Sequence, residues 1–246
     1  MGRVDGISYR ERTGKDLSGE KFCQFIDLFK RSSKEVRDIE QKKRVVKEQV
    51  EILENYAMEY GLFFIENIYE EYKSEKGKDI EKLKSGNESD VYVLNDNGKK
   101  KIIKIVNWEA LLINNTPFEF LVNKIILHNT LFPSTCYKFI GLQYHFGNFY
   151  FVLEQSYIEV FSDYKGNIVE ATLDEVDKDI ERYGFTKVDD AYVSSDYIIS
   201  DLVNIEKGKR ELRIDNVIKG EDCNLYYIDP IVGLNTKNRS YINFLS

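Results

Sequence analysis

Proline, cysteine, histidine and tryptophan are scarce in this chain of 246 residues. It has 3 Pro, 3 Cys, 2 His and 1 Trp, whereas Tyr and Phe number 17 and 15. This composition, with 42% hydrophobic residues, argues against a disordered chain and for a folded core. No CxxC pair joins Cys23, Cys136 and Cys223, so the sequence suggests neither a disulfide framework nor a zinc knuckle. We expect three reduced thiols in a cytoplasmic protein.

Long apolar runs and excess positive charge are also missing. Runs such as residues 61–65 are far too short to span a bilayer, and the polar first residues predict no signal peptide. The formal net charge of −7 disfavours broad attraction to nucleic acid or anionic lipid. We therefore expect neither nucleic acid nor a membrane among the partners.

The two histidines do not form a recognisable catalytic pattern. His128 and His145 fit neither the HExxH spacing of a zinc protease nor a catalytic triad. His128 ends a predicted helix, where its side chain can bond the last carbonyls. We expect both histidines to be structural.

Helical periodicity dominates residues 1–76, which we predict to be an N-terminal extension. Its main helix would run from about Ser33 to Tyr60 and end at Gly61. Offsets of three and four give this helix an apolar seam that contains one lysine. The seam consists of Val36, Ile39, Lys43, Val46, Val50, Leu53, Ala57 and Tyr60.

Two shorter helical patterns flank this seam. Residues 21–30 carry apolar side chains on one helical face, and Ser32 with Glu35 matches a capping box. Residues 62–73 read as one more amphipathic helix. Two interpretations of the extension stay open: a helical hairpin packed on the main domain, or self-association through residues 33–60.

Beyond Gly77 the pattern changes to short β-rich runs with two helices among them. Asn95 to Gly98 is a strong hairpin turn. Pro117 starts one helix, and Thr172 with Glu175 forms a capping box for the other. The predicted strands are 90–94, 101–106, 139–142, 149–154, 217–219 and 225–228, and the predicted helices are 118–129 and 172–183.

Lys104 is the first candidate for chemistry. Strand alternation places it on one face with Ile102 and Val106, in an apolar strip. A lysine buried there needs an anion. Glu119 in the next helix is one source, although a glutamate in a first turn is also favoured by the helix dipole alone.

Asn216 and Asp229 are the most informative pair. One precedes the first strand of a predicted hairpin and the other follows the second, so both lie at the same end. Two oxygen donors there would suit Mg²⁺. The alternative is an Asn in a turn and an Asp that caps the chain before Pro230.

Seven segments from Lys84 onward form a recognisable set. They are SGNESDVYVL (85–94), IIKIVN (102–107), HNTLFPSTCYKFIGL (128–142), FYFVLEQSYI (149–158), ERYGF (181–185), SDL (200–202) and DNVIKGEDCNLYYIDPI (215–231). With these motifs the chain resembles protein-kinase-like domains, especially those of polyvalent proteins from phages and bacterial mobile elements. The resemblance implies an α+β, minimal two-lobed protein-kinase-like domain over residues 77–246. Its N-lobe, an antiparallel sheet with one helix, would cover about 77–155, and a reduced C-lobe about 156–246.

The resemblance also implies ATP and Mg²⁺ as cofactors, and a protein as a further partner. Asp201 matches the catalytic base, Lys104 the strand lysine with Glu119 as its helix partner, and Asn216 and Asp229 the two metal ligands. The remaining nucleotide-binding positions are the phosphate loop Ser85, Gly86, Asn87 and Glu88, and the adenine hinge Glu154, Gln155 and Tyr157.

Two departures from the kinase pattern stand out. Kinases place the base five residues before the metal asparagine, whereas Asp201 and Asn216 are fifteen apart, with residues 204–213 as an inserted, charged loop. Only seventeen residues follow Asp229, too few for an activation segment and a full helical lobe. Three interpretations therefore stay open: an active phosphotransferase, a catalytically inactive module that binds a nucleotide or protein, and a helical scaffold.

Overall fold

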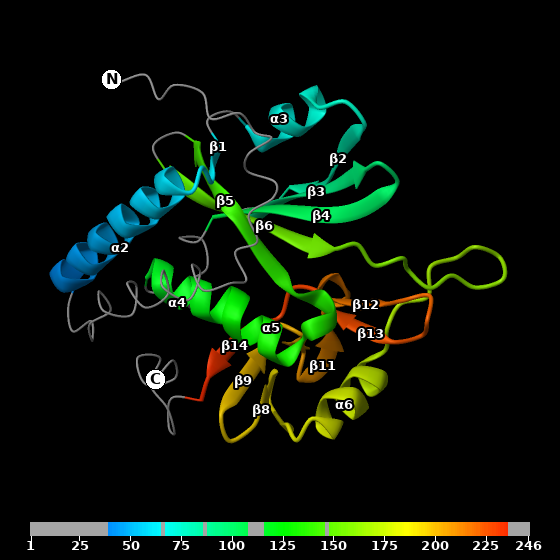
Figure 1. Cartoon of the computed structure of the whole chain (residues 1–246). Helices are drawn as coiled ribbons and strands as arrows, with labels where there is room; N and C mark the ends of the chain where they lie inside the picture. The colour runs from blue at the N-terminus through cyan, green and yellow to red at the C-terminus, as the bar shows by residue number, and fades with distance from the viewer. Residues whose placement is uncertain (1–38, 65–66, 86–87, 108–115, 146–147, 236–246) are drawn as a thin grey trace. The chain divides into compact units, whose positions relative to one another are not determined.

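The computed structural model describes residues 39–64, 67–85, 88–107, 116–145 and 148–235 (Figure 1). It has the mixed helices and sheets of an α+β fold. The chain divides into two compact units, one of Met1–Phe120 with Lys138–Gln155 and the other of Leu121–Tyr137 with Ser156–Ser246. The predicted helix at 21–30 and the capping box at Ser32 lie outside the described residues.

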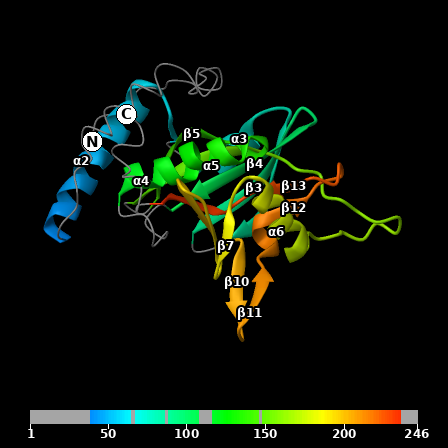
Figure 2. The same cartoon turned by 90° about the horizontal axis from the view of Figure 1, so that it is seen from below.

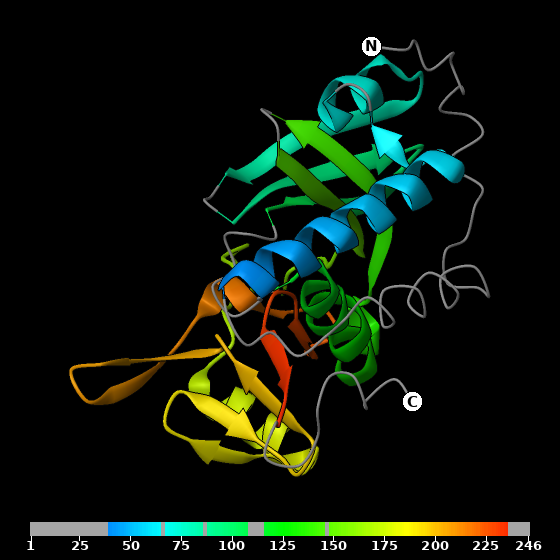
Figure 3. The ribbon, with the colours of Figure 1, turned by 90° about the vertical axis from the view of Figure 1, so that its left-hand side faces the viewer.

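Helix α2 (Ile39–Glu59) is unbroken along its length (Figure 3). It ends where predicted, because Gly61 takes a positive φ of 64° and the Leu62 N–H donates to the Ala57 carbonyl. The buried face differs from the predicted seam, since Lys43 is exposed. The buried residues are Val45, Gln49, Leu53, Tyr56 and Ala57. Self-association through residues 33–60 stays a prediction.

The helix predicted over residues 62–73 is wrong in its first part. Phe63–Phe64 form strand β1, which pairs parallel with β5 (Tyr137–His145), and only Ile68–Ser74 are helical, as α3. The approach of the two strands is so close that a Cβ at Gly141 would lie 2.2 Å from the Leu62 carbonyl oxygen. Pairing with a distant strand overrides the local helical period here.

The sheet of the first unit has the strand order β1-β5-β6-β4-β3-β2. The strands β3 (Ser89–Asp96) and β4 (Lys99–Val106) form the predicted hairpin, with Asn97 and Gly98 both at positive φ. The strand β6 (Asn148–Ser156) confirms the run predicted at 149–154, whereas β2 (Lys78–Ser85) was not predicted. The parallel pair β1–β5 brings residues 63–64, from the predicted helical extension, into this sheet.

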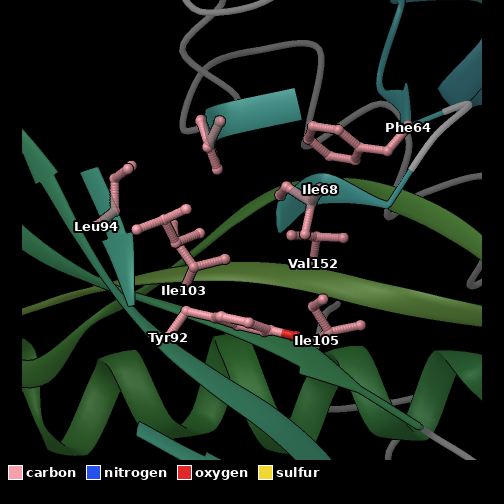
Figure 4. Packing of buried hydrophobic residues seen from close by; sticks show 9 residues of the cluster. Phe64, Ile68, Tyr92, Leu94, Ile103, Ile105 and Val152 are labelled. Atoms are coloured by element: carbon pink, nitrogen blue, oxygen red, sulfur yellow. The ribbon is translucent and has the colours of Figure 1, made fainter. Parts of the chain in front are cut away.

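Apolar side chains on one face of this sheet, Phe64 of β1 among them, pack with residues of α3 (Figure 4). Ile103 and Val152 are fully buried, as is Ile68 from α3. The cluster consists of Phe64, Ile68, Tyr72, Ile80, Tyr92, Leu94, Ile103, Ile105 and Val152.

Helical residues 117–131 form three consecutive segments: α4 (Pro117–Leu121), the π-helix η3 (Val122–Leu127) and α5 (His128–Leu131). The helix itself was predicted, but its π segment was not. A 3-10 turn, η4 (Pro133–Thr135), follows. His128 is fully buried, with Nε2 3.0 Å from the Thr135 carbonyl oxygen, so it contacts the following 3-10 turn and not the last carbonyls of its own helix as predicted.

The second unit holds helix α6 (Leu173–Arg182), where the predicted capping box of Thr172 and Glu175 is present. A four-stranded sheet has the order β14-β9-β8-β7. Its strands are β7 (Thr186–Val188), β8 (Ala191–Val193), β9 (Tyr197–Ser200) and β14 (Ile231–Leu234).

Two hairpins complete the second unit. One pairs β12 (Val217–Lys219) with β13 (Leu225–Tyr227), close to the prediction. The other pairs β10 (Val203–Glu206) with β11 (Lys209–Leu212), so the loop predicted over 204–213 is wrong. The β10–β11 hairpin projects from the rest of the second unit (Figures 2 and 3).

No helix among the described residues is both long and apolar enough to cross a bilayer.

Candidate active site

Asn216 and Asp229 lie at the same end of the β12–β13 hairpin, as the sequence predicted. Asn216 ends the 3-10 turn η5 (Ile214–Asn216), directly before β12. Val217 pairs with Tyr227, and the Ile228 N–H donates to the Asn216 carbonyl oxygen at 3.0 Å. The hairpin ladder therefore fixes the backbone of both candidate metal ligands next to each other.

Asp201 adjoins this hairpin end. It follows β9 and has a positive φ of 64°, a conformation that non-glycine residues adopt rarely and that often marks functional positions. The Asn216 amide nitrogen donates to two oxygens of Asp201, the backbone carbonyl oxygen and, at 3.0 Å, the side-chain Oδ2. The Arg213 guanidinium forms an ion pair with Asp201 Oδ1. Asp201 is thus held at both carboxylate oxygens.

The β10–β11 hairpin explains how fifteen residues separate Asp201 from Asn216 while their side chains touch. Val203 pairs with Leu212, and the Arg213 N–H donates to the Leu202 carbonyl oxygen at 2.8 Å. The ten residues 203–212 therefore form a hairpin whose two ends lie side by side, which brings Leu202 next to Arg213. Subtracting ten from the separation of fifteen leaves five, which is the kinase spacing given above.

Asp229 is held by two side chains that sequence reasoning missed. The Lys124 ammonium, from the π segment η3, forms an ion pair with Asp229 Oδ1. The Tyr137 hydroxyl lies 3.0 Å from the same oxygen and 2.6 Å from the Ile228 carbonyl oxygen. A helical lysine and a tyrosine at the start of a strand carry no sequence signal of this role.

The strand before Asp229 is anchored by the same chain segment. The Thr135 hydroxyl donates to the Tyr227 carbonyl oxygen at 2.7 Å, next to the Tyr137 contact with Ile228. Residues 124–137 thus bind three successive residues, Tyr227 to Asp229. This anchoring sets the direction in which the Asp229 carboxylate points.

Lys104 belongs to the first unit and is only 4% exposed, as its position in the apolar strip predicted. It lies in β4 opposite Val91, between the buried residues Ile103 and Ile105. Glu119 is half-buried in the first turn of α4, where its backbone N–H donates to the Thr116 hydroxyl at 3.2 Å. The pairing of Lys104 with Glu119 stays a prediction.

The predicted phosphate loop falls between β2 and β3. Gly86 and Asn87 lie outside the described residues, and Ser85 ends β2. Glu88 is exposed, and its carbonyl oxygen accepts from the Asn107 N–H at 2.8 Å. This bond connects the start of β3 to the end of β4, so it closes one side of the predicted loop.

The predicted adenine hinge lies where the chain passes between the two units, at Gln155 and Ser156. Glu154 Oε2 accepts from the Lys101 ammonium at 3.0 Å, within the first unit. Gln155 is buried and Tyr157 is half-buried. Contact of these residues with an adenine stays a prediction.

The donor set at Asn216 and Asp229 fits a magnesium ion. The Asn216 amide nitrogen donates to Asp201, and the donors that would meet a cation are the Asn216 amide oxygen and the Asp229 carboxylate, both oxygen ligands of the kind that Mg²⁺ prefers. Within the part of the chain that the structure describes, no three His, Cys, Asp or Glu side chains gather as a metal site. Water and phosphate oxygens would complete the shell, which is how proteins usually bind Mg²⁺.

No curated protein matches the chain. A family model described as a serine/threonine/tyrosine kinase found in polyvalent proteins matches residues 46–236, well over half of the sequence. The matched range includes Lys104, Asp201, Asn216 and Asp229. The chain therefore belongs to the family of serine/threonine/tyrosine kinases found in polyvalent proteins.

Proposed function

We propose that this protein is an ATP-dependent phosphotransferase that uses Mg²⁺. The observation that carries the proposal is the contact of Asp201 with Arg213 and Asn216 across a hairpin that closes on itself. It supports a catalytic loop that keeps the kinase arrangement despite ten additional residues. Family membership supports the same reaction class.

In this proposal Asp201 orients the acceptor hydroxyl and accepts its proton. Arg213 and Asn216 keep its two carboxylate oxygens in fixed directions, so that the base does not need to reorganise before transfer. Asn216 and Asp229 would hold Mg²⁺, which neutralises charge on the phosphates when it is bound.

The nucleotide would be bound by residues of the first unit together with the chain that leaves it. Lys104, oriented by Glu119, would bind phosphate oxygens. Backbone groups would cover the phosphates and meet the adenine, at Ser85, Gly86, Asn87 and Glu88 and at Glu154, Gln155 and Tyr157.

The proposal extends to architecture and setting. We assign residues 77–155 to an N-lobe and 156–246 to a reduced C-lobe of a minimal two-lobed kinase, although the segment 121–137 groups with the second unit. A phage or mobile-element origin follows from the resemblance, and a cytoplasmic location from the supply of ATP and reduced thiols there. A protein is the proposed acceptor.

A catalytically inactive nucleotide-binding module is the second candidate. It is favoured by the ion pair of Asp229 with Lys124. It is also favoured by Pro230, which follows Asp229 where kinases usually have the Phe of an Asp-Phe-Gly motif. This module would show a thermal shift with Mg-ATP but no turnover.

Transfer of labelled phosphate from ATP, measured with the thermal shift caused by Mg-ATP, separates these functions. We expect Asp201→Asn to reduce transfer by roughly 100-fold or more while the thermal shift persists. Lys104→Ala and Asp229→Ala should lose transfer and weaken the shift. Asp174→Asn, an exposed aspartate of α6, is the matched control that retains both. A wild-type chain with neither transfer nor shift would reject both candidates.

A further inference from the structure

The contact between Lys124 and Asp229 has features of an internal counter-ion. The Lys124 side chain is 12% exposed and that of Asp229 is 31% exposed. The lysines and arginines in the other described ion pairs of the second unit are more exposed, from 17% for Lys219 to 78% for Arg182. An ammonium withdrawn from water to this extent needs its anion close by.

The Lys124–Asp229 ion pair lies at the proposed metal site. Asp229 is the carboxylate to which the proposed function assigns the metal, and Lys124 meets it through Oδ1. An ammonium and a divalent cation at one carboxylate repel each other strongly in a partly buried site. The two cations therefore compete for Asp229.

Tyr137 provides Asp229 with a second contact besides Lys124. Its hydroxyl lies within hydrogen-bond distance of both Asp229 Oδ1 and the Ile228 carbonyl oxygen, and the Lys124 ammonium lies 5.2 Å from the centre of its ring. The four-carbon lysine stem is flexible and can turn away while its backbone stays fixed. Its backbone lies in the π segment η3, and π turns occur frequently at functional sites.

We propose that Lys124 is a built-in counter-ion that occupies Asp229 until a divalent cation replaces it. Lys124 then acts as a positioning residue, which preserves the Asp229 geometry in the metal-free protein and sets the cation concentration that the site requires. The inference rests on the proposed function, because it takes Asp229 as a metal ligand.

The test is the manganese dependence of thermal stability, measured at a fixed concentration of a non-hydrolysable ATP analogue. Lys124→Met removes the charge and keeps the stem. We expect its Mn²⁺ midpoint to fall at least about tenfold below that of the wild type. Its melting temperature in EDTA should also fall, because Asp229 loses the ion pair with the Lys124 ammonium. Lys178→Met, in the exposed Lys178–Asp174 pair, is the matched control with an unchanged Mn²⁺ midpoint.

Two further variants keep the result decisive. Should Lys124→Met not fold, Lys124→Gln retains a hydrogen-bond donor without the charge and carries the same expectation. In EDTA, Lys124→Met combined with Asp229→Asn should lose less stability than the sum of the single changes.

The experiment distinguishes a failure of the counter-ion role from a failure of the proposed function. If the wild type responds to Mn²⁺ with the analogue but Lys124→Met responds at the same or a higher concentration, the counter-ion role is overturned and the proposed function stands. If wild type, Lys124→Met and Asp229→Asn all fail to respond, both the counter-ion role and the proposed function are overturned.

Discussion

Buried glutamines fix the starts of two helices in the first unit. Gln49 of α2 accepts from the Phe118 N–H at the start of α4, and Gln143 of β5 accepts from the Ile68 N–H at the start of α3, each at 3.0 Å. The first N–H groups of a helix have no partner within the helix, so these side chains supply acceptors to donors at the two helix starts. Gln49 thereby joins α2 to the helix that contains Glu119.

Replacing Gln49 by Leu should therefore destabilise the protein, because the contact between α2 and the start of α4 is lost. The change keeps the side chain buried but removes the acceptor for Phe118, and we expect a loss of about 1–3 kcal/mol in the free energy of unfolding. Urea unfolding followed by circular dichroism measures it. Lys47→Leu, on the exposed side of the same helix, is the control with little effect. Equal losses for both variants would refute the capping role.

Glu175 links α6 to the strand that follows Asn216. Its Oε1 accepts from the Lys219 ammonium at 2.7 Å, and its Oε2 accepts from the Thr172 N–H at 2.9 Å. The hydrogen bond from Lys219 and then that from Thr172 lower the pKa of Glu175 from 4.5 to about 2. A carboxylate with a lowered pKa stabilises the fold above its unfolded pKa, and this stabilisation is lost as the pH falls through the folded pKa.

The stability advantage of wild type over Glu175→Gln should therefore be present at pH 5 and shrink between pH 4.5 and about 2. Because the Glu175 side chain is 38% exposed, solvent screening reduces the effect to on the order of 1 kcal/mol. Urea midpoints at pH 5, 4 and 3 provide the measurement, with Glu170→Gln as a control for general acid effects. A difference that stays constant with pH would contradict this account of Glu175.

Individual residues differ in how far the sequence predicts them. The burial of Lys104 follows from strand alternation, which depends only on near neighbours. Lys124 could not be found in this way, because its partner Asp229 is 105 residues away and many helices carry exposed lysines. The kinase resemblance drew attention to Asp229 but gave no reason to pair it with a helical lysine.

The β10–β11 hairpin is the element that most changes the interpretation of the chain. Its charged sequence suggested a loop, yet Val203, Ile205, Arg210 and Leu212 alternate with polar neighbours, and Lys207-Gly208 supplies two positive φ angles for the turn. Arg210 also bonds Asp177 of α6 at 3.1 Å. The period of two was present in the sequence, but the four-residue strands are too short to stand out.

Deleting residues 203–212 should leave an active protein. Leu202 and Arg213 are already joined by a backbone hydrogen bond, so direct connection restores a spacing of five with a small shift. We expect phosphotransfer within about tenfold of wild type. The stability loss should be about 2–4 kcal/mol, from the buried Val203 side chain and the missing Arg210–Asp177 pair.

Deletion of residues 203–211 is the matched control, because it leaves a spacing of six between Asp201 and Asn216. A misplacement of this size should reduce transfer by roughly 100-fold or more. If both deletions fold and both are inactive, the hairpin itself contributes to the site and the spacing argument fails.

The missed strands β1 and β2 have different causes. The strand β1 pairs with β5, which lies far along the chain, so its two residues carry no local strand signal. The strand β2 pairs with its neighbour β3, with Ser85 opposite Asp90, but Lys78–Ser85 lacks the alternation of an independent strand. The confirmed elements, such as the β3–β4 hairpin and α6, carry their own turn and capping residues. Turn and capping signals therefore predicted local structure, whereas a partner far along the chain leaves no such signal.

The family match covers parts of both units. The matched range begins at residue 46, inside α2, and Gln49 of that helix caps α4. The α+β class and the family were both predictable from the sequence, because motifs distributed over two-thirds of the chain support them. The assignments of individual residues to nucleotide and metal remain proposals.

The most direct measurement is an anomalous-difference map from crystals grown with Mn²⁺ and a non-hydrolysable ATP analogue. We expect a manganese peak about 2 Å from Asn216 Oδ1 and from the Asp229 carboxylate. The Lys124 ammonium should have moved away from Asp229. A bound nucleotide whose manganese lies elsewhere, with Lys124 still on Asp229, would contradict both expectations.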